Sequence, residues 1–302
     1  MAHVYVYSPS GAVLDRAGLK RAVKRLQALG HEVEVDPSAL SQHQRFAGDD
    51  AERLASVTRA AHSRADVAMM TRGGYGLTRL LPQLPYKALA KAVEQGTQFV
   101  GLSDFTALSL AMLAQTGTPT WQGPLVIDDF GQETEPDEIM QACFDDLLVG
   151  HGEGAGWMLP KADALINPLR INNATLWGGN LCVLCSLVGT PYLPAVKGGV
   201  LFVEDVAEHP YRVERMLTQL HHAGVLKQQK AVLIGRFTQF KAVKGYDRGF
   251  GMASVVARLR DQLKMPVLTG LPFGHVATKV LLPVGQKISL LAEDRDALLF
   301  WG

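Results

Sequence analysis

The first half of the chain alternates short apolar runs with longer amphipathic stretches. Apolar residues recur at helical spacing from Leu14 to Leu29, among Arg and Lys, and Gly30 ends this stretch. The same patterns predict strands at residues 4–7, 31–35, 67–70 and 98–101, and helices at residues 14–29, 49–64, 86–95 and 105–115. This alternation indicates βαβ units and therefore an α/β fold with a parallel sheet.

The composition changes between residues 123 and 156, where Asp, Glu, Gly and Gln predominate around an expected helix at 137–148. Short strands bounded by Gly and Pro follow, together with clear helices. The expected strands are residues 200–203, 231–234, 267–268, 287–291 and 297–301, and the helices are 210–222 and 252–263. We therefore divide the chain into a domain of residues 1–123, a connecting segment of residues 124–160 and a mixed α/β domain of residues 161–302.

The composition is that of a folded protein of about two domains. The 302 residues are 47% hydrophobic and 20% charged, which is ordinary for a globular protein and excludes a disordered one. A formal net charge of +1 predicts binding neither to nucleic acid nor to an anionic membrane. The chain shows no membrane-length apolar run and no signal-peptide pattern. With only three cysteines, we expect a cytoplasmic location.

A serine lies at an expected turn from strand to helix, in the segment Phe99-Val-Gly-Leu-Ser103-Asp-Phe-Thr. Such a turn exposes the hydroxyl, and the first N–H groups of the helix can stabilise an oxyanion beside it. Phe105 stands where the α/β-hydrolase signature requires glycine, so that family is not indicated. Ser103 and Asp104 are also good helix-capping residues, and this segment alone leaves both interpretations open.

The segment Arg72-Gly-Gly-Tyr-Gly76 follows the expected strand at 67–70. Three glycines in four positions let the backbone approach a ligand closely, although the spacing matches neither a dinucleotide fingerprint nor a P-loop. The segment is either a tight turn or a site in which Gly74 donates its N–H and Arg72 anchors a carboxylate or braces the loop. Because this loop and the Ser103 turn both follow parallel strands, we expect them at the same edge of the sheet.

A serine nucleophile needs a base, and the base needs an orienting acceptor. Among nine histidines His275 fits best, because it lies in a Gly/Pro-rich loop, Gly270-Leu-Pro-Phe-Gly-His275. Glu204 and Asp205 end an apolar strand, where unpaired carboxylates are costly. They either cap the helix at 210–222, or one of them orients a base. Alternation places them on opposite sides of the strand, so only one can face a given histidine.

The pair Cys182-Val-Leu-Cys185 has redox spacing but lies in an apolar helical run, with no second pair elsewhere. We interpret both cysteines as buried small hydrophobic residues. Neither a metal site nor a cofactor is expected.

Motifs in a fixed order give the chain a family resemblance. They are Arg72-Gly-Gly-Tyr-Gly76, Gly101-Leu-Ser-Asp-Phe-Thr106, Leu176-Trp-Gly-Gly-Asn-Leu181, Leu201-Phe-Val-Glu-Asp205 and Phe273-Gly-His275. Together they resemble the LD-carboxypeptidase (muramoyltetrapeptide carboxypeptidase) family of serine peptidases, from Ser8-Pro-Ser-Gly11 to about Pro283.

The resemblance implies a role for each matching residue. Ser103 corresponds to the nucleophile, His275 to the general base and Glu204 to the orienting acid. The N–H groups of Gly74 and Asp104 correspond to the oxyanion hole, while Arg72 stays our prediction for binding the substrate's terminal carboxylate. The implied fold is a flavodoxin-like N-terminal domain carrying the nucleophile and a smaller, β-rich C-terminal domain carrying the acid and the base, in a homodimer.

The implied reaction is removal of the terminal D-alanine from the murein tetrapeptide L-Ala-D-Glu-meso-diaminopimelate-D-Ala in peptidoglycan recycling. Two alternatives remain at this point. A peptidase of the same family that cleaves a peptide–nucleotide antibiotic would share the triad, but would also hold the nucleobase on an aromatic or basic surface. A non-catalytic module would bind muropeptide without releasing D-alanine.

Overall fold

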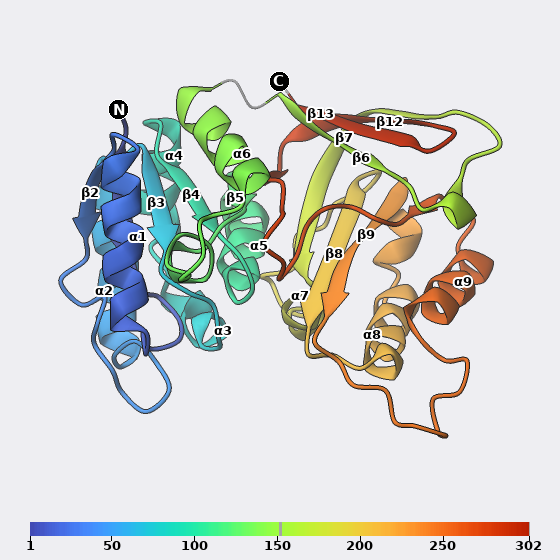
Figure 1. Cartoon of the computed structure of the whole chain (residues 1–302), viewed down its shortest axis with the longest axis horizontal. Helices are drawn as coiled ribbons and strands as arrows, with labels where there is room; N and C mark the ends of the chain where they lie inside the picture. Colours follow the sequence, from blue (N-terminus) through green and yellow to red (C-terminus); the bar gives the residue numbers. More distant parts are fainter. Residues whose placement is uncertain (151–152, 302) are drawn as a thin grey trace. The chain divides into compact units, whose positions relative to one another are not determined.

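The computed structural model describes residues 1–150 and 153–301, and it divides into two units (Figure 1). The first unit takes in Met1–Gly152 and Ala277–Val284, and the second takes in Glu153–Val276 and Gly285–Gly302. Each unit is built on its own sheet. The segment at 124–160, which the sequence sets apart as a connection, contributes to both units.

The first unit is an α/β layer structure around a mostly parallel sheet. Its elements are β1 (His3–Tyr7), α1 (Arg16–Ala28), β2 (Glu32–Val35), α2 (Asp50–His62), β3 (Val67–Met70), α3 (Leu77–Leu80), η1 (Leu81–Gln83), α4 (Tyr86–Glu94), β4 (Gln98–Gly101), α5 (Phe105–Thr116), β5 (Thr120–Gln122), η2 (Val126–Phe130), α6 (Glu138–Val149) and β11 (Leu282–Val284). The strand order is β11-β5-β4-β3-β1-β2. Strands β1 to β5 are parallel in the order 2-1-3-4-5, which is the flavodoxin-like order, and β11 adds an antiparallel edge.

Burial and capping explain these elements. Every residue of β3 is buried, as expected of a strand covered on both faces in a parallel sheet. At the start of α2, Asp49 accepts from the N–H of Glu52 and the Glu52 side chain accepts from the N–H of Asp49. This capping box satisfies two N–H groups that the helix itself leaves unpaired.

The second unit has a mixed sheet. Its elements are β6 (Gly154–Met158), η3 (Lys161–Asp163), β7 (Leu169–Asn180), α7 (Leu181–Ser186), β8 (Val200–Val206), α8 (Pro210–His222), η4 (Leu226–Gln228), β9 (Ala231–Thr238), α9 (Met252–Gln262), β10 (Val267–Leu268), β12 (Lys287–Glu293) and β13 (Asp296–Trp301). The order is β10-β9-β8-β7-β12-β13-β6, in which β7 to β10 are parallel and the β12, β13 and β6 side is antiparallel.

The predicted fold class, a flavodoxin-like parallel-sheet domain with a smaller β-rich domain, is confirmed. The strands at 67–70, 98–101 and 267–268 and the helix at 210–222 have the predicted limits. The strands β5, β6, β7 and β11 have no counterpart among the strands predicted from the sequence. Among the helices of the described residues, none combines the length and apolar character needed to cross a bilayer.

Strand β7 reaches its neighbour β8 so closely that one position accepts only glycine. Gly178 has a φ of 141°, and a Cβ there would overlap the carbonyl oxygen of Phe202. Gly189 also has positive φ, 82°, but no atom lies within 4 Å of its would-be Cβ.

We predict that Gly178→Ala lowers the free energy of unfolding by more than about 3 kcal/mol, because it adds a backbone clash to the conformational strain. The control Gly189→Ala introduces only the strain and should cost about 1–2 kcal/mol. Urea unfolding of both variants measures the difference, and equal losses would contradict this explanation.

Candidate functional site

Ser103 lies in the turn between β4 and α5, in the first unit. It is half-buried and has a φ of 67°, a left-handed conformation that is uncommon for any residue other than glycine. Strain of this kind is concentrated at functional sites. The turn thus holds a hydroxyl at the N-terminus of a helix, as the sequence predicts for a nucleophile.

Asp104 occupies the N-cap position of α5 but forms no side-chain cap. Its carboxylate instead accepts hydrogen bonds from the Ser10 hydroxyl at 2.6 Å and from the N–H of Leu77 at 2.9 Å. Burial raises the pKa of Asp104, and these two bonds partly offset the effect. The capping interpretation is therefore wrong for this carboxylate, which ties the Ser103 turn to the segment with Ser10 and to the start of α3.

The Gly73–Gly74 turn lies directly against Ser103. A Cβ on Gly73 would lie 2.6 Å from the Ser103 Cβ and 2.7 Å from its Oγ. The carbonyl of Gly73 accepts from the N–H of Gly11 at 3.3 Å. Since C=O and N–H point in opposite directions across a trans peptide, this bond turns the N–H of Gly74 away from Gly11. Only glycine at position 73 permits this approach, a requirement that the sequence analysis did not identify.

Arg72 braces this loop through one hydrogen bond from its guanidinium group. Its Nη1 donates to the carbonyl of Ala12 at 3.2 Å, and its side chain is part-buried. A guanidinium carries five N–H donors, so this contact leaves most of them for a ligand. The structure therefore fits the bracing role proposed for Arg72 and is compatible with the carboxylate role.

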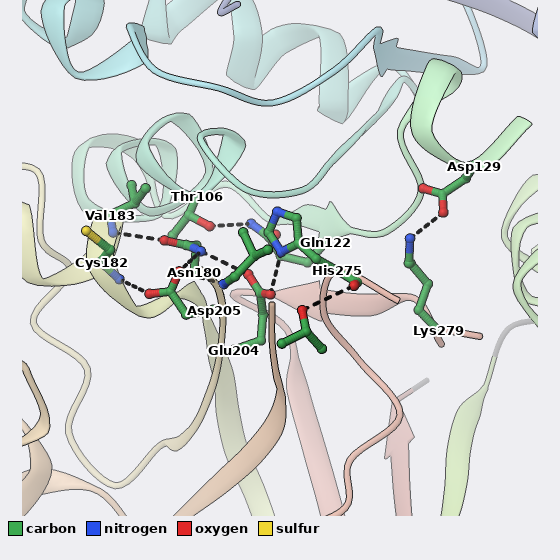
Figure 2. A network of polar contacts seen from close by, with 12 residues as sticks. Thr106, Gln122, Asp129, Asn180, Cys182, Val183, Glu204, Asp205, His275 and Lys279 are labelled. Carbon is green, nitrogen blue, oxygen red and sulfur yellow. Dashed lines mark hydrogen bonds and ion pairs between the residues drawn. The ribbon is translucent and has the colours of Figure 1, made fainter. Parts of the chain in front are cut away.

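In the second unit, Glu204 holds His275 (Figure 2). Oε2 of Glu204 lies 2.7 Å from Nδ1 of His275. The Glu204 side chain is 0% exposed, whereas that of His275 is 19% exposed. An ionised carboxylate can only accept here, so Nδ1 of the imidazole donates the proton of this hydrogen bond. This is the arrangement of an oriented general base.

Asn180, at the end of β7, connects Glu204 to a second carboxylate (Figure 2). Its Nδ2 donates to Glu204 Oε1 at 3.2 Å and to Asp205 Oδ1 at 2.8 Å, while its Oδ1 caps α7 by accepting from Val183. The sequence analysis quoted Asn180 within a motif but gave it no role. Its two acid partners follow 24 and 25 residues later in the chain, so no local sequence signal pointed to this role.

Asp205, the neighbouring acid, has a structural role. Its carboxylate accepts from the backbone N–H groups of Cys182 at 2.9 Å and Val206 at 2.9 Å. It therefore braces α7, and not the helix at 210–222 as the sequence analysis considered, because His209 caps that helix. Burial raises the pKa of Asp205 to about 6, and its hydrogen bonds partly offset this rise.

Glycines on neighbouring segments make room for the imidazole. A Cβ on Gly274, whose φ is 140°, would lie 3.1 Å from Glu204 Oε2. A Cβ on Gly235 would lie 2.6 Å from the Phe273 carbonyl oxygen and 3.3 Å from the Glu204 Cβ. Side chains at either position would push apart the loop and the strand that hold the pair together.

The chain returns to the first unit directly after His275. Thr278 Oγ1 donates to Asp137 Oδ2 at 2.5 Å, and the ammonium group of Lys279 pairs with Asp129 (Figure 2). Both members of this ion pair are buried, with side chains 3% exposed. The return segment is thus fixed by a buried pair, whose separation would leave an uncompensated charge.

The structure groups the predicted residues within each unit. The first unit brings together Ser103, Asp104, Gly74 and Arg72, and the second pairs Glu204 with His275.

One cysteine prediction is wrong: Cys182 is exposed, because the six-residue helix α7 buries only its other face, including Cys185. No cluster of His, Cys, Asp and Glu within residues 1–150 and 153–301 is suited to holding a metal ion.

Sequence comparisons match both halves of the chain to one family. Residues 4–123 match the model described as the LD-carboxypeptidase N-terminal domain, and residues 173–290 match the LD-carboxypeptidase C-terminal domain. The Glu204 strand lies within the second match, as does His275.

Known proteins resemble the chain over most of its length. The crystal structure of muramoyltetrapeptide carboxypeptidase from Oxalobacter formigenes is 38% identical, with a TM-score of 0.88 over 99% of this chain and 98% of that one. A Bacillus subtilis protein named "Probable murein peptide carboxypeptidase" is 27% identical over 94% of this chain and 88% of its own. The microcin C7 self-immunity protein MccF of Escherichia coli is 28% identical over 76% of this chain and 72% of its own.

We predict that Asp205→Asn lowers the free energy of unfolding by about 1–3 kcal/mol at pH 8, because an NH₂ group replaces an accepting oxygen. The pKa of Asp205 rises from 3.8 in the unfolded chain to about 6 in the folded one. The wild type therefore loses stability from this carboxyl as the pH rises through that interval, and the variant does not. Urea unfolding should show a larger difference between the two proteins at pH 4 than at pH 8. A difference that grows with pH would contradict this account of Asp205.

Proposed function

Since this chain belongs to the LD-carboxypeptidase family and is a serine carboxypeptidase, we propose that it removes the terminal D-alanine from murein tetrapeptide. The substrate is L-Ala-D-Glu-meso-diaminopimelate-D-Ala, and the reaction serves peptidoglycan recycling in the cytoplasm. The relatives named for muramoyltetrapeptide and murein peptide support this substrate class. Ser103, His275 and Glu204 carry the reaction through an acyl-enzyme.

One observation carries the assignment of the base: the 2.7 Å contact of His275 with a fully buried Glu204. Burying a carboxylate is costly unless it is paired and hydrogen-bonded, and Glu204 gains this from His275 and Asn180. The imidazole is partly exposed, so part of the ring can be reached by substrate. An imidazole held in this way takes a proton from a serine hydroxyl and returns it to the leaving amine.

The backbone N–H groups around Ser103 support its role as the nucleophile. The N–H of Asp104 is one of the first N–H groups of α5, which the helix cannot pair internally. The N–H of Gly74 is turned away from Gly11, in a loop packed on Ser103. Two such donors stabilise an oxyanion, and each is typically worth about 3 kcal/mol of barrier.

The path of the chain supports a reaction that uses residues of both units. Thr278 lies three residues after His275 and is anchored to Asp137 of the first unit. An extended chain spans at most about 3.6 Å per residue, so the imidazole loop is tethered within roughly 11 Å of that anchor. The loop that carries the proposed base is therefore joined to the first unit by only a few residues.

In the proposed mechanism, Ser103 Oγ attacks the carbonyl carbon of the L-centre of diaminopimelate as His275 Nε2 takes the hydroxyl proton. Glu204 stabilises the imidazolium, and the Gly74 and Asp104 N–H groups stabilise the oxyanion. The peptide C–N bond breaks, and His275 protonates the amine of departing D-alanine. Water, activated by His275, then hydrolyses the Ser103 ester.

A second candidate function comes from the similarity to MccF, which is named as a microcin C7 self-immunity protein. A peptidase of that type would cleave an amide in a peptide–nucleotide antibiotic with the same triad. Parallel assays of the tetrapeptide and of such an antibiotic separate the two functions, and we expect the higher kcat/KM for the tetrapeptide.

We predict that Ser103→Ala abolishes release of D-alanine, measured by mass spectrometry, while circular dichroism shows an intact fold. The control Ser41→Ala removes a serine hydroxyl from an exposed contact with Glu52 and should leave turnover unchanged. Turnover of Ser103→Ala near the wild-type rate would exclude Ser103 as nucleophile.

We also predict that Glu204→Gln lowers kcat by about 10³–10⁴-fold, because a neutral amide no longer stabilises the imidazolium and can select the wrong tautomer. Asp205→Asn is the matched control: the neighbouring acid contacts backbone N–H groups and Asn180, so its loss should reduce kcat far less. Equal losses in steady-state assays would show that the orienting acid was chosen wrongly.

A further inference from the structure

A small cavity in the first unit opens beside the Gly73–Gly74 turn. Its volume is about 240 Å³, and its lining includes Gly11, Arg45, Arg72, Gly74 and Tyr75. Ligand sites for drug-sized molecules measure about 300–1,000 Å³, so this cavity fits something smaller, such as a single amino-acid residue. The lining shares Gly74 with the proposed oxyanion hole.

The charged side chains that line this cavity are all positive. Two arginines line it, and no Asp or Glu does so among the residues that the structure describes. The Arg45 guanidinium lies 5.9 Å from the centre of the Tyr75 ring, and the described chain offers it no hydrogen-bond acceptor. Guanidinium groups bind carboxylates through paired N–H donors. The cavity therefore suits a small anion.

The two arginines are held by the same backbone residue. The N–H of Ala12 donates to the carbonyl of Arg45 at 3.0 Å, and the carbonyl of Ala12 accepts from Nη1 of Arg72 at 3.2 Å. A Cβ on the preceding Gly11 would lie 2.8 Å from the Gly73 carbonyl oxygen and 3.3 Å from Arg72 Nη1. The segment at 11–12 thus contacts the backbone of Arg45 and the guanidinium of Arg72, next to the Gly73–Gly74 turn.

Carboxypeptidase chemistry requires a cation at this distance from the reacting carbonyl. In a peptide that ends one residue after the scissile bond, the terminal carboxylate is one residue away, about 3.8 Å along the chain. If Gly74 donates to the oxyanion, the carboxylate must bind among the immediate neighbours of Gly74. Arg45 and Arg72 are the charged residues of that lining.

We propose that this cavity is the subsite for the leaving residue, and that Arg45, with Arg72, binds its free carboxylate. The inference rests on the proposed function and adds Arg45 as a determinant of exopeptidase specificity. The segment with Gln42, Gln44 and Arg45 forms one wall of the cavity. A chain that continued beyond the leaving residue would meet this wall and would lack the charge that pairs with Arg45.

Direct binding tests the subsite without any turnover. Nuclear magnetic resonance titrations of the wild type with N-acetyl-D-alanine should show binding, and titrations with N-acetyl-D-alaninamide should show at least tenfold weaker binding. Arg45→Ala should abolish this preference, and Arg45→Lys, which keeps charge but loses the paired donors, should retain part of it. Arg79→Ala is the control, because Arg79 is an exposed arginine that pairs with Asp50 outside the cavity.

Kinetics test the same subsite during the reaction. Arg45→Ala should raise KM for the tetrapeptide at least tenfold with kcat within threefold, and should reduce the preference for the free acid over a C-terminally amidated tetrapeptide. Arg79→Ala should change neither value. Wild-type KM and an unchanged acid preference in Arg45→Ala would overturn the proposal. A protein that releases no D-alanine, yet binds N-acetyl-D-alanine through Arg45, would refute the proposed function and support the subsite.

Discussion

The buried carboxylate of Glu204 is the constraint on which the second unit's polar chemistry depends. A fully buried anion is tolerated only when donors surround it, and His275 and Asn180 are the donors here. To reach it, the histidine loop must approach β8 without side chains between them, which explains Gly274 and Gly235. Glu204 thus orients the imidazole of His275, and the close approach of the two requires glycine at positions 274 and 235.

In the first unit, the constraint is the close packing of backbone segments around Ser103. A glycine turn packs on the strained Ser103, and the Asp104 carboxylate ties that turn to neighbouring loops. The absence of a side chain at Gly73 lets this turn pack directly against the Ser103 side chain. The edge of a parallel sheet makes this possible, because loops that follow neighbouring strands meet there.

Local patterns predicted the elements of the first half well, because apolar spacing and helix caps act over a few residues. They missed β7 (Leu169–Asn180), which lies between β8 and β12 in its sheet. That strand contains Asn172, Asn173 with positive φ, and the glycines Gly178 and Gly179, all poor strand formers. Its pairing is decided by tertiary contacts, such as the close approach of Gly178 to Phe202, that no local pattern contains.

The distinction between local sequence patterns and tertiary contacts also applies to the site. Motif order gave Ser103, Glu204 and His275, yet the role of Asn180 depends on acids 24 and 25 residues away. Glu204 and Asp205 were expected at the end of an apolar strand, and β8 includes both acids, which find hydrogen-bond donors there.

Detection of the acyl-enzyme tests the central claim most directly. Wild-type protein is mixed with tetrapeptide, quenched in acid within milliseconds, digested and mapped by mass spectrometry. The account predicts that the L-Ala-D-Glu-diaminopimelate acyl group is attached to Ser103. Release of D-alanine with the acyl group on another residue would contradict it.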